Sequence, residues 1–184
     1  MNYKDFYKMK TGTHNSGTGE RPLGLLSYIG IPFARCQSKT ITQQYLAGAR
    51  YFDLRVKWYC GEFHLAHGLW LSLRTLAGIL DEISDFPETC HVILTYEGKD
   101  SGTGYMNFMR SALLLPGRYW KIEWEYFAVK KPKWRIIRMD GKNYPEQGFY
   151  PLTGWRCLLP FPYLWAKLRK KNAKTDKWVL VDFL

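Results

Sequence analysis

The chain switches repeatedly between the two-residue period of strands and the three-to-four-residue period of helices. Runs rich in aromatic and β-branched residues predict strands at Phe6–Met9, Arg50–Lys57, Phe63–Ala66, Val92–Tyr96, Lys121–Val129, Trp134–Met139 and Trp178–Phe183. Apolar residues at helical spacing predict helices at Ile41–Gly48, Leu73–Ser84 and Tyr105–Leu115. Pro116-Gly117 is expected to end the last of these, and Thr11–Gly19 is predicted to be a loop.

Alternating strands and helices are typical of an α/β fold with a largely parallel sheet. A length of 184 residues, with 46% hydrophobic and 23% charged residues, suits a single domain with a packed core. We therefore expect one domain over residues 1–184, without an internal repeat or a linker.

Charge and aromatic content indicate a phosphate-rich partner. The 27 Lys and Arg exceed the 16 Asp and Glu, which gives a formal net charge of +11 and favours nucleic acid or an anionic lipid surface. Eight Trp and thirteen Tyr suit a membrane interface, and no RNA-binding motif accompanies them. We expect membrane contacts from Trp155, Phe161, Tyr163, Trp165, Lys167, Arg169 and Lys170.

No apolar run in the sequence is long enough to cross a bilayer, and the first ten residues lack the hydrophobic core of a secretory signal. The expected location is cytoplasmic or peripheral to a membrane, with secretion by another route left open. The four cysteines are Cys36, Cys60, Cys90 and Cys157. Their wide spacing favours reduced thiols over a zinc site, with two disulfides as the alternative.

The segment Tyr51–Val56 places charged and apolar side chains on opposite faces of a strand. Asp53 and Arg55 share one face, while Phe52, Leu54 and Val56 share the other. Both faces of a parallel sheet are covered, so a charged pair near a strand end indicates an active site. An internal salt bridge is the alternative.

His14 lies in a glycine-flanked loop after a strand, where exposed backbone N–H groups and small side chains would let a phosphate approach closely. His67 ends another strand before Gly68, so both histidines are expected at the C-terminal edge of the sheet. Two histidines and an arginine can cleave a phosphodiester, since one histidine accepts a proton, the other donates one, and the arginine stabilises the phosphorane. A solvated loop histidine is the alternative for His14.

Two carboxylates are further candidates. Glu97 follows a buried strand and could bind substrate or metal, or be simply solvated. Asp182 interrupts an apolar strand and could orient a histidine, or could lie at a frayed chain end. His64 and His91 lie near the starts of their strands and are expected to be structural.

Three segments, Gly12–Thr18, Gly48–Arg55 and Leu65–Gly68, together resemble the X-domain of phosphatidylinositol-specific phospholipases C. The resemblance extends over about Met9–Asp100 and returns at Val179–Phe183. It implies a distorted or minimal TIM-type (β/α) barrel. It also implies a reaction in which the 2-hydroxyl of the substrate's own inositol attacks the phosphate. The products would be diacylglycerol and a cyclic inositol phosphate.

The resemblance also implies roles for individual residues. His14 is similar to the general base, His67 to the general acid and Arg55 to the phosphate clamp, with Asp182 orienting His14 and Asp53 beside Arg55. Asn15, Glu97 and Lys99 are assigned to substrate binding. Metal-independent bacterial members usually carry Asp where Asn15 stands. Calcium-dependent members carry Asn there, but they have an acidic ligand where Arg55 stands. We expect no metal, and Asn15, Asp53 and Glu97 are the ligands if calcium binds.

Two other classes of function remain open. One is a weakly catalytic module of the same fold that binds a lipid headgroup or a membrane. The other is a basic nucleic-acid binder, which charge alone favours and which we expect less. The headgroup and the oligomeric state cannot be read from the sequence.

Overall fold

The computed structural model describes residues 11–131, 135–141, 149–150 and 179–181. Several sequence predictions lie outside these ranges, namely the strand at Phe6–Met9, Asp182, Cys157 and the expected membrane contacts of residues 155–170. In the part of the chain that is described, no helix has both the length and the apolar character of a membrane-crossing segment. Among the same residues, Cys60 and Cys90 carry free thiols.

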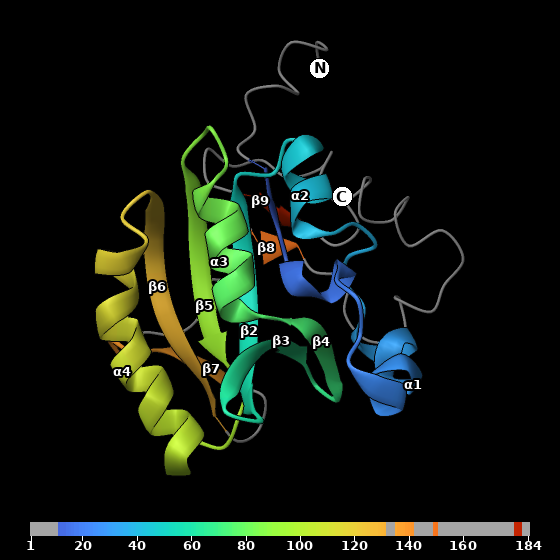
Figure 1. The fold of residues 1–184 in the computed structure, drawn as a ribbon, viewed down its shortest axis with the longest axis vertical. Coiled ribbons are helices and arrows are strands. Elements are labelled where there is room, and N and C mark those ends of the chain that lie inside the picture. The colour runs from blue at the N-terminus through green and yellow to red at the C-terminus, as the bar shows by residue number, and fades with distance from the viewer. Residues whose placement is uncertain (1–10, 132–134, 142–148, 151–178, 182–184) are drawn as a thin grey trace.

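The centre of the fold is a mixed β-sheet in which most neighbouring strands are parallel (Figure 1). Its main path has the strand order β7-β6-β5-β2-β1-β9-β8. These strands are β1 (Thr11–Thr13), β2 (Tyr51–Tyr59), β5 (Cys90–Tyr96), β6 (Ile122–Lys131), β7 (Arg135–Arg138), β8 (Phe149–Tyr150) and β9 (Val179–Val181). Only β6 and β7 pair antiparallel on this path, so the predicted largely parallel sheet is confirmed.

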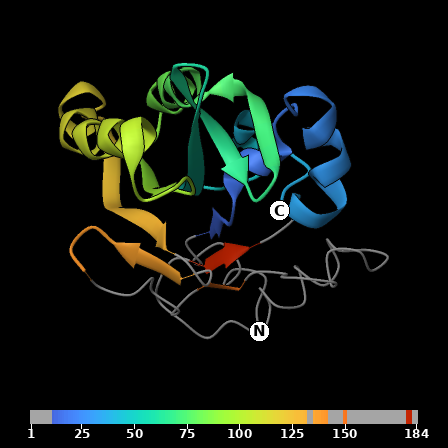
Figure 2. The same cartoon turned by 90° about the horizontal axis from the view of Figure 1, so that it is seen from below.

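A hairpin leaves the main path at β2. Strand β3 (Glu62–His67) runs antiparallel to β2 and then pairs with β4 (Trp70–Thr75). The turn between β2 and β3 holds Cys60 and Gly61 at φ 47° and 89°, the left-handed values that a tight hairpin turn requires. Strands β3 and β4 lie on the same side of the main sheet as the helices (Figure 2).

Within the described ranges, four helices accompany the sheet: α1 (Gly24–Ala34), α2 (Ile41–Leu46), α3 (Leu76–Ser84) and α4 (Gly102–Arg118). A short 3-10 helix, η2 (Ser16–Gly19), follows β1. Figure 1 shows α3 and α4 in front of the central strands, while α1 lies beside β4 at the opposite end of the molecule from α4.

The core lies between the sheet and these helices. Phe52, Leu54 and Val56 on one face of β2 are fully buried in it, together with Ile79 and Leu80 of α3. Burial of each such side chain is worth about 1.5–3 kcal/mol relative to exposure. Asp53 and Arg55 point to the other face, as the alternation in β2 predicts.

Three local predictions were wrong in part. Thr11–Thr13 is a strand because it pairs with both β2 and β9, although it is only three residues long. Residues 70–75 form β4, and α3 begins only after Thr75, whose side chain accepts from Gly78 N–H as an N-cap. Helix α4 continues past Pro116, since the N–H of Tyr119 still reaches the carbonyl of Leu115, at 2.8 Å.

The sheet does not close into a barrel within the described residues. Its path ends at β7 on one side and β8 on the other, and no pairing joins these two strands there. The structure therefore establishes a mixed α/β fold with an open sheet. A closed barrel is not observed.

Candidate active site

His14 directly follows β1 and is held in a buried, tightly turned segment. The next residue, Asn15, adopts left-handed backbone angles of 46° and 49°, a conformation that Asn tolerates better than most residues. Its N–H donates to Oδ2 of Asp53 at 3.2 Å, and the His14 carbonyl accepts from Nε2 of Gln37 at 3.1 Å. The left-handed turn thereby links the end of β1 to the charged face of β2.

The glycines of this segment are required for close packing. A Cβ at Gly17 would lie 2.7 Å from the Leu65 side chain, and one at Gly19 would lie 1.8 Å from the Lys39 carbonyl oxygen. Ser16, Gly17 and Thr18 are all buried. The segment is therefore buried rather than exposed, because the missing side chains of these glycines let it pack against β3 and residue 39. Its contact with a phosphate stays a prediction.

Arg55 is the centre of a buried charge network. Its Nη2 donates to Oδ2 of Asp53 at 3.2 Å, and its Nη1 donates to Oε1 of Glu97 at 3.1 Å. Asp53 and Glu97 are almost inaccessible to solvent, and Arg55 is 7% exposed. The Arg55 guanidinium therefore compensates the charge of two buried carboxylates, and Lys130 contributes a second cation, 3.3 Å from Glu97.

The ring of His14 faces this network. Its Nε2 lies 2.9 Å from Nη2 of Arg55 and 3.0 Å from Nδ2 of Asn15. A guanidinium can only donate hydrogen bonds, so Nε2 is the acceptor and the hydrogen of the neutral ring is on Nδ1. Burial, together with the charge of Arg55, lowers the pKa of His14 to about 3. His14 is therefore a neutral proton acceptor near pH 7.

His67 reaches the same site from a different direction than the sequence suggested. It ends β3, which is antiparallel to β2, so it does not lie on the C-terminal edge of a parallel strand. The hairpin instead brings it back beside His14, with ring centroids 6.5 Å apart and ring planes perpendicular. Burial lowers the pKa of His67 to about 3, and its Nδ1 is buried without a hydrogen-bond partner in the described structure.

The turn after His67 is held by hydrogen bonds to both backbone polar groups of Gly68. Gly68 adopts φ 59°, its N–H donates to Oε2 of Glu97 at 3.1 Å, and its carbonyl accepts from Nζ of Lys57. Burial would raise the pKa of Glu97, but Arg55, His67, Lys130 and the Gly68 N–H together lower it to about 2. Glu97 therefore remains a carboxylate and holds Arg55 and the His67 turn in one arrangement.

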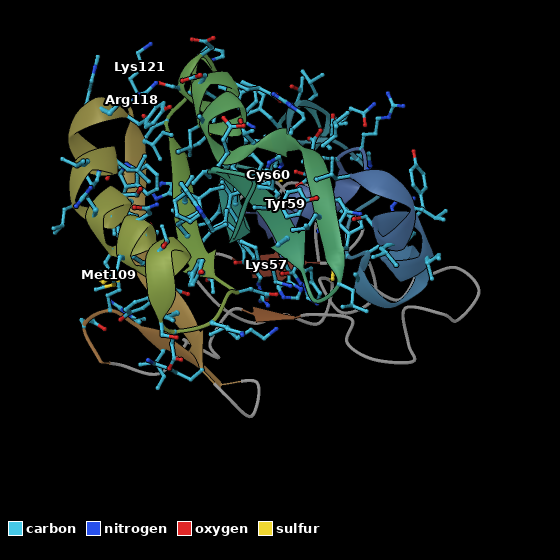
Figure 3. All side chains as sticks on the ribbon, turned by 60° about the horizontal axis from the view of Figure 1, so that its bottom comes forward. Lys57, Tyr59, Cys60, Met109, Arg118 and Lys121 are labelled. Carbon is cyan, nitrogen blue, oxygen red and sulfur yellow. The ribbon has the colours of Figure 1, made fainter. Side chains whose placement is uncertain are left out.

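A cavity of about 680 Å³ opens beside this turn. Its lining combines the lysines with two acidic residues and an exposed leucine: Lys57, Lys99, Lys130, Lys131, Glu97, Asp100 and Leu69. Burial lowers the pKa of Lys57. Figure 3 shows Lys57 well separated from Arg118 and Lys121, the basic residues near the end of α4. The cavity is thus a local concentration of positive charge suited to an anionic ligand.

The structure brings together most of the residues that the sequence singled out. The six that meet in the network are His14, Asn15, Asp53, Arg55, His67 and Glu97, and Lys99 lines the adjoining cavity. His64 and His91 lie elsewhere, where they contact the Ser72 carbonyl and Glu125. Sequence reasoning missed Lys57 and Lys130. Lys57 could have been found, because it follows Asp53 and Arg55 at the same two-residue period.

The same residues decide how well a cation would fit. Oδ1 of Asn15 and Oδ1 of Asp53 are buried, and neither has a hydrogen-bond partner among the described residues. However, Arg55 lies between Asp53 and Glu97, and both oxygens of Glu97 already accept hydrogen bonds or ion pairs. No group of three His, Cys, Asp or Glu residues suited to a metal occurs in the described ranges. The arrangement fits a resident calcium ion poorly, since the guanidinium would repel it.

The two histidines should make the fold sensitive to acid. Unfolded histidine binds a proton near pH 6.5, whereas the pKa values of His14 and His67 are both about 3 in the folded chain. Between these pH values the unfolded state binds more protons than the folded state. The contribution of the two histidines to the free energy of unfolding is therefore fully present above pH 6.5 and is lost as the pH decreases. We expect a loss of about 2 kcal/mol per histidine at pH 5.

Urea denaturation at pH 7.5 and at pH 5 would measure this loss. The variant His67→Gln removes one of the two groups, so its stability should change less between the two pH values. An equal change in the variant and the original chain would contradict the assignment for His67.

Comparison with known proteins supports the fold. No protein-family model matches the chain, and no curated protein matches its sequence. A histidine-to-tyrosine mutant of the phosphatidylinositol-specific phospholipase C from Staphylococcus aureus has a TM-score of 0.58 at 16% identity, over 96% of this chain and 86% of that chain. A form of the same enzyme that carries pentafluorophenylalanine has a TM-score of 0.56 at 14% identity, over the same shares.

A double mutant of the Staphylococcus aureus enzyme is similar over a shorter range. It has a TM-score of 0.53 at 16% identity over 77% of this chain, and the match spans 55% of that chain. At such identities the similarity establishes a shared fold, and the chemistry has to be argued from the side chains.

Proposed function

We propose that the chain is a phosphodiesterase of the phosphatidylinositol-specific phospholipase C type. The observation that carries this proposal is the close approach of the His14 and His67 rings next to Arg55, beside a lysine-lined cavity. Two histidines and a fixed guanidinium form the minimal set for cleavage of a phosphodiester by proton transfer and charge stabilisation. The fold shared with enzymes of that name supports the same assignment.

In the proposed reaction, His14 Nε2 removes the proton from the inositol 2-hydroxyl as that oxygen attacks phosphorus. The bond between phosphorus and the glycerol oxygen then breaks, and His67 gives its proton to the leaving oxygen. The products are diacylglycerol and a cyclic inositol phosphate. Arg55 stabilises the negative charge that builds up on the phosphorus-bound oxygens.

This reaction requires His67 to carry a proton when the leaving oxygen departs. The pKa of His67 is about 3 because the ring is buried and Arg55 and His14 add to the effect of burial. A bound phosphodiester brings a negative charge next to the ring, and an opposite charge within 4–6 Å favours the protonated form. Substrate binding is therefore part of the proposed mechanism, since it prepares the general acid.

We propose that no metal takes part. Arg55 already supplies the positive charge between Asp53 and Glu97 that a calcium ion would otherwise provide. We further propose that the open sheet is part of a distorted barrel, with the charged face of β2 directed to its interior. The opposite face of β2 carries the apolar core, as in a barrel wall covered by helices.

One observation favours a second candidate, a headgroup-binding module with weak catalysis. Both Arg55 and Asn15 donate to His14 Nε2, the atom that the mechanism needs as the base. If these contacts persist when substrate is bound, the site recognises a phosphate without cleaving it rapidly. Lipid binding without turnover would support this candidate.

Product analysis tests the main proposal. With phosphatidylinositol vesicles in excess chelator, we expect ³¹P NMR to show a cyclic phosphodiester as the first product. A cyclic product requires a neighbouring hydroxyl as nucleophile and thus identifies both substrate and mechanism. Vesicles of phosphatidylcholine are the matched control, because choline offers no such hydroxyl. A phosphate monoester as the first product would contradict the proposed attack.

A further inference from the structure

A second cavity lies on the other face of β2 from the candidate active site. It measures about 360 Å³ and is enclosed by α3, α4 and the hairpin of β2 and β3. Trp58 lines this cavity, whereas the preceding residue, Lys57, lines the lysine-rich cavity, because successive residues of a strand point to opposite faces. The two cavities are therefore separate, and the proposed reaction does not use the second one.

Short side chains on α4 leave this space open. Figure 1 shows α3 and α4 side by side on the same face of the sheet. Asn107 and Ser111, one helical turn apart, line the cavity where larger apolar side chains would otherwise fill the space between the helices. The hydroxyl of Tyr119 donates to Oδ1 of Asp81 at 2.9 Å. This bond joins the end of α4 to α3, while the cavity stays open between the two helices.

The floor of the cavity is apolar. Leu80 is fully buried, Phe63 and Leu76 are nearly so, and all three belong to the core. The ring of Trp58 lies against that of Phe63, with centroids 4.8 Å apart. Small-molecule sites are typically cavities of about 300–1,000 Å³ with mostly apolar linings. The floor therefore suits a hydrocarbon chain, and the volume, at the small end of that range, suits a single chain.

The rim of the cavity carries positive charge. Arg110 and Arg118 lie about two helical turns apart on α4, and both are exposed. Neither arginine forms an ion pair with a carboxylate of the described residues. The Arg118 guanidinium lies over the ring of Tyr119, 5.2 Å from its centroid, and this ring lines the cavity. The lining also contains Glu62, so two cations face one anion.

We propose that this cavity binds a fatty acid, with the acyl chain on the apolar floor and the carboxylate at Arg110 and Arg118. A guanidinium can donate two parallel hydrogen bonds to a carboxylate, and this small head leaves most of the cavity to the chain. An amphiphile with a cationic head would be repelled by the same arginines. The bound fatty acid would touch none of the groups placed in the phosphodiesterase reaction, so the site is a further binding function of the chain.

Titration calorimetry on the full chain tests this site with three ten-carbon probes, each below the concentration at which it forms micelles. Decanoate should bind at least about threefold more tightly than decan-1-ol, because each exposed arginine adds a modest attraction for the carboxylate. Decyltrimethylammonium should bind more weakly than either. Equal affinities for the three probes, or no binding of decanoate, would overturn the proposal.

Variants test the apolar floor and the charged rim separately. Ala77→Trp places a large ring in the cavity from the exposed start of α3, and it should weaken binding of decanoate and decan-1-ol at least about tenfold, because the chain loses its apolar contacts. Arg110→Gln with Arg118→Gln should abolish the preference for decanoate and leave decan-1-ol binding unchanged. The matched control is Lys121→Gln, which removes a charge close to Arg118 (Figure 3) but outside the lining, and it should bind like the original chain.

The variants also give the results that would contradict the site. Unchanged decanoate affinity in folded Ala77→Trp would place the ligand elsewhere on the chain. If circular dichroism shows that this variant does not fold, Ser111→Trp blocks the cavity from the side of α4 and should weaken binding in the same way. Self-association that Ala77→Trp abolishes in ultracentrifugation, without any binding of decanoate, would assign the cavity to a second copy of the chain and overturn the fatty-acid site.

Discussion

Replacing His14 with alanine is expected to lower phosphodiester turnover by about 10²–10⁴-fold, and His67→Ala should have an effect of similar size. Each variant removes one of the two groups that would transfer protons during the reaction. Initial rates on phosphatidylinositol vesicles would measure the loss, and circular dichroism would confirm folding. His91→Ala is the matched control, because His91 lies near the start of β5 and contacts Glu125.

A change of leaving group can distinguish the two histidines. A nitrophenyl ester of inositol phosphate releases an oxygen that needs no proton, so its cleavage should depend much less on His67. The same substrate still requires a base at the 2-hydroxyl, and His14→Ala should remain defective. Near-normal turnover by a folded variant of either histidine on phosphatidylinositol would refute the role of that residue.

Replacing Arg55 with lysine is expected to cost about 10²–10³-fold in turnover, as does the loss of one preorganised donor to a developing oxyanion. Lysine keeps the charge but cannot contact Asp53, Glu97 and His14 at once, as the planar guanidinium does. The matched control is Arg50→Lys, because Arg50 donates two hydrogen bonds to the carboxylate of Glu88 at the protein surface, away from the candidate site. Rates measured in excess chelator would test both variants.

The same assay tests the role of metal. If Arg55 replaces a cation, chelation should leave the original chain active. Arg55→Asp would add a carboxylate to Asn15, Asp53 and Glu97, and we expect its residual turnover to depend on calcium. Activity of the original chain that is abolished by chelator and restored by calcium would contradict the role given to Arg55.

Local sequence patterns predicted those parts of the site that depend on a single strand. The two-residue alternation of β2 correctly separated Asp53 and Arg55 from the apolar face. It could not predict that Arg55 pairs with Glu97, 42 positions further along the chain, because that contact depends on the register between β2 and β5. The role given to Asp182 stays a prediction, because this residue lies outside the described ranges.

Errors arose where two local signals competed. Leu73 and Leu76 lie at helical spacing, yet pairing with β3 keeps residues 70–75 extended, and the capping hydroxyl of Thr75 marks the true start of α3. Helix α1 was missed because it contains two glycines and a proline, which normally argue against a helix. Its close packing on β4 outweighs these propensities, and packing of this kind is not visible in a single sequence.

Because β2 and β3 form a hairpin, we expect some residues of the candidate site to come together earlier in folding than others. Arg55 and His67 are only twelve positions apart, so joining them closes a short loop at a small entropic cost. Isolated hairpins form within about 1–10 microseconds. We expect His14 and Glu97 to join the site later, because they depend on the pairing of β2 with β1 and β5, which lie farther away in the sequence. The turn at Cys60 and Gly61 thus brings Arg55 and His67 near each other, and Glu97 then holds both through Arg55 and the Gly68 N–H. A change in the length of that turn would alter the pairing register and turn His67 away from Arg55 while leaving the rest of the sheet intact.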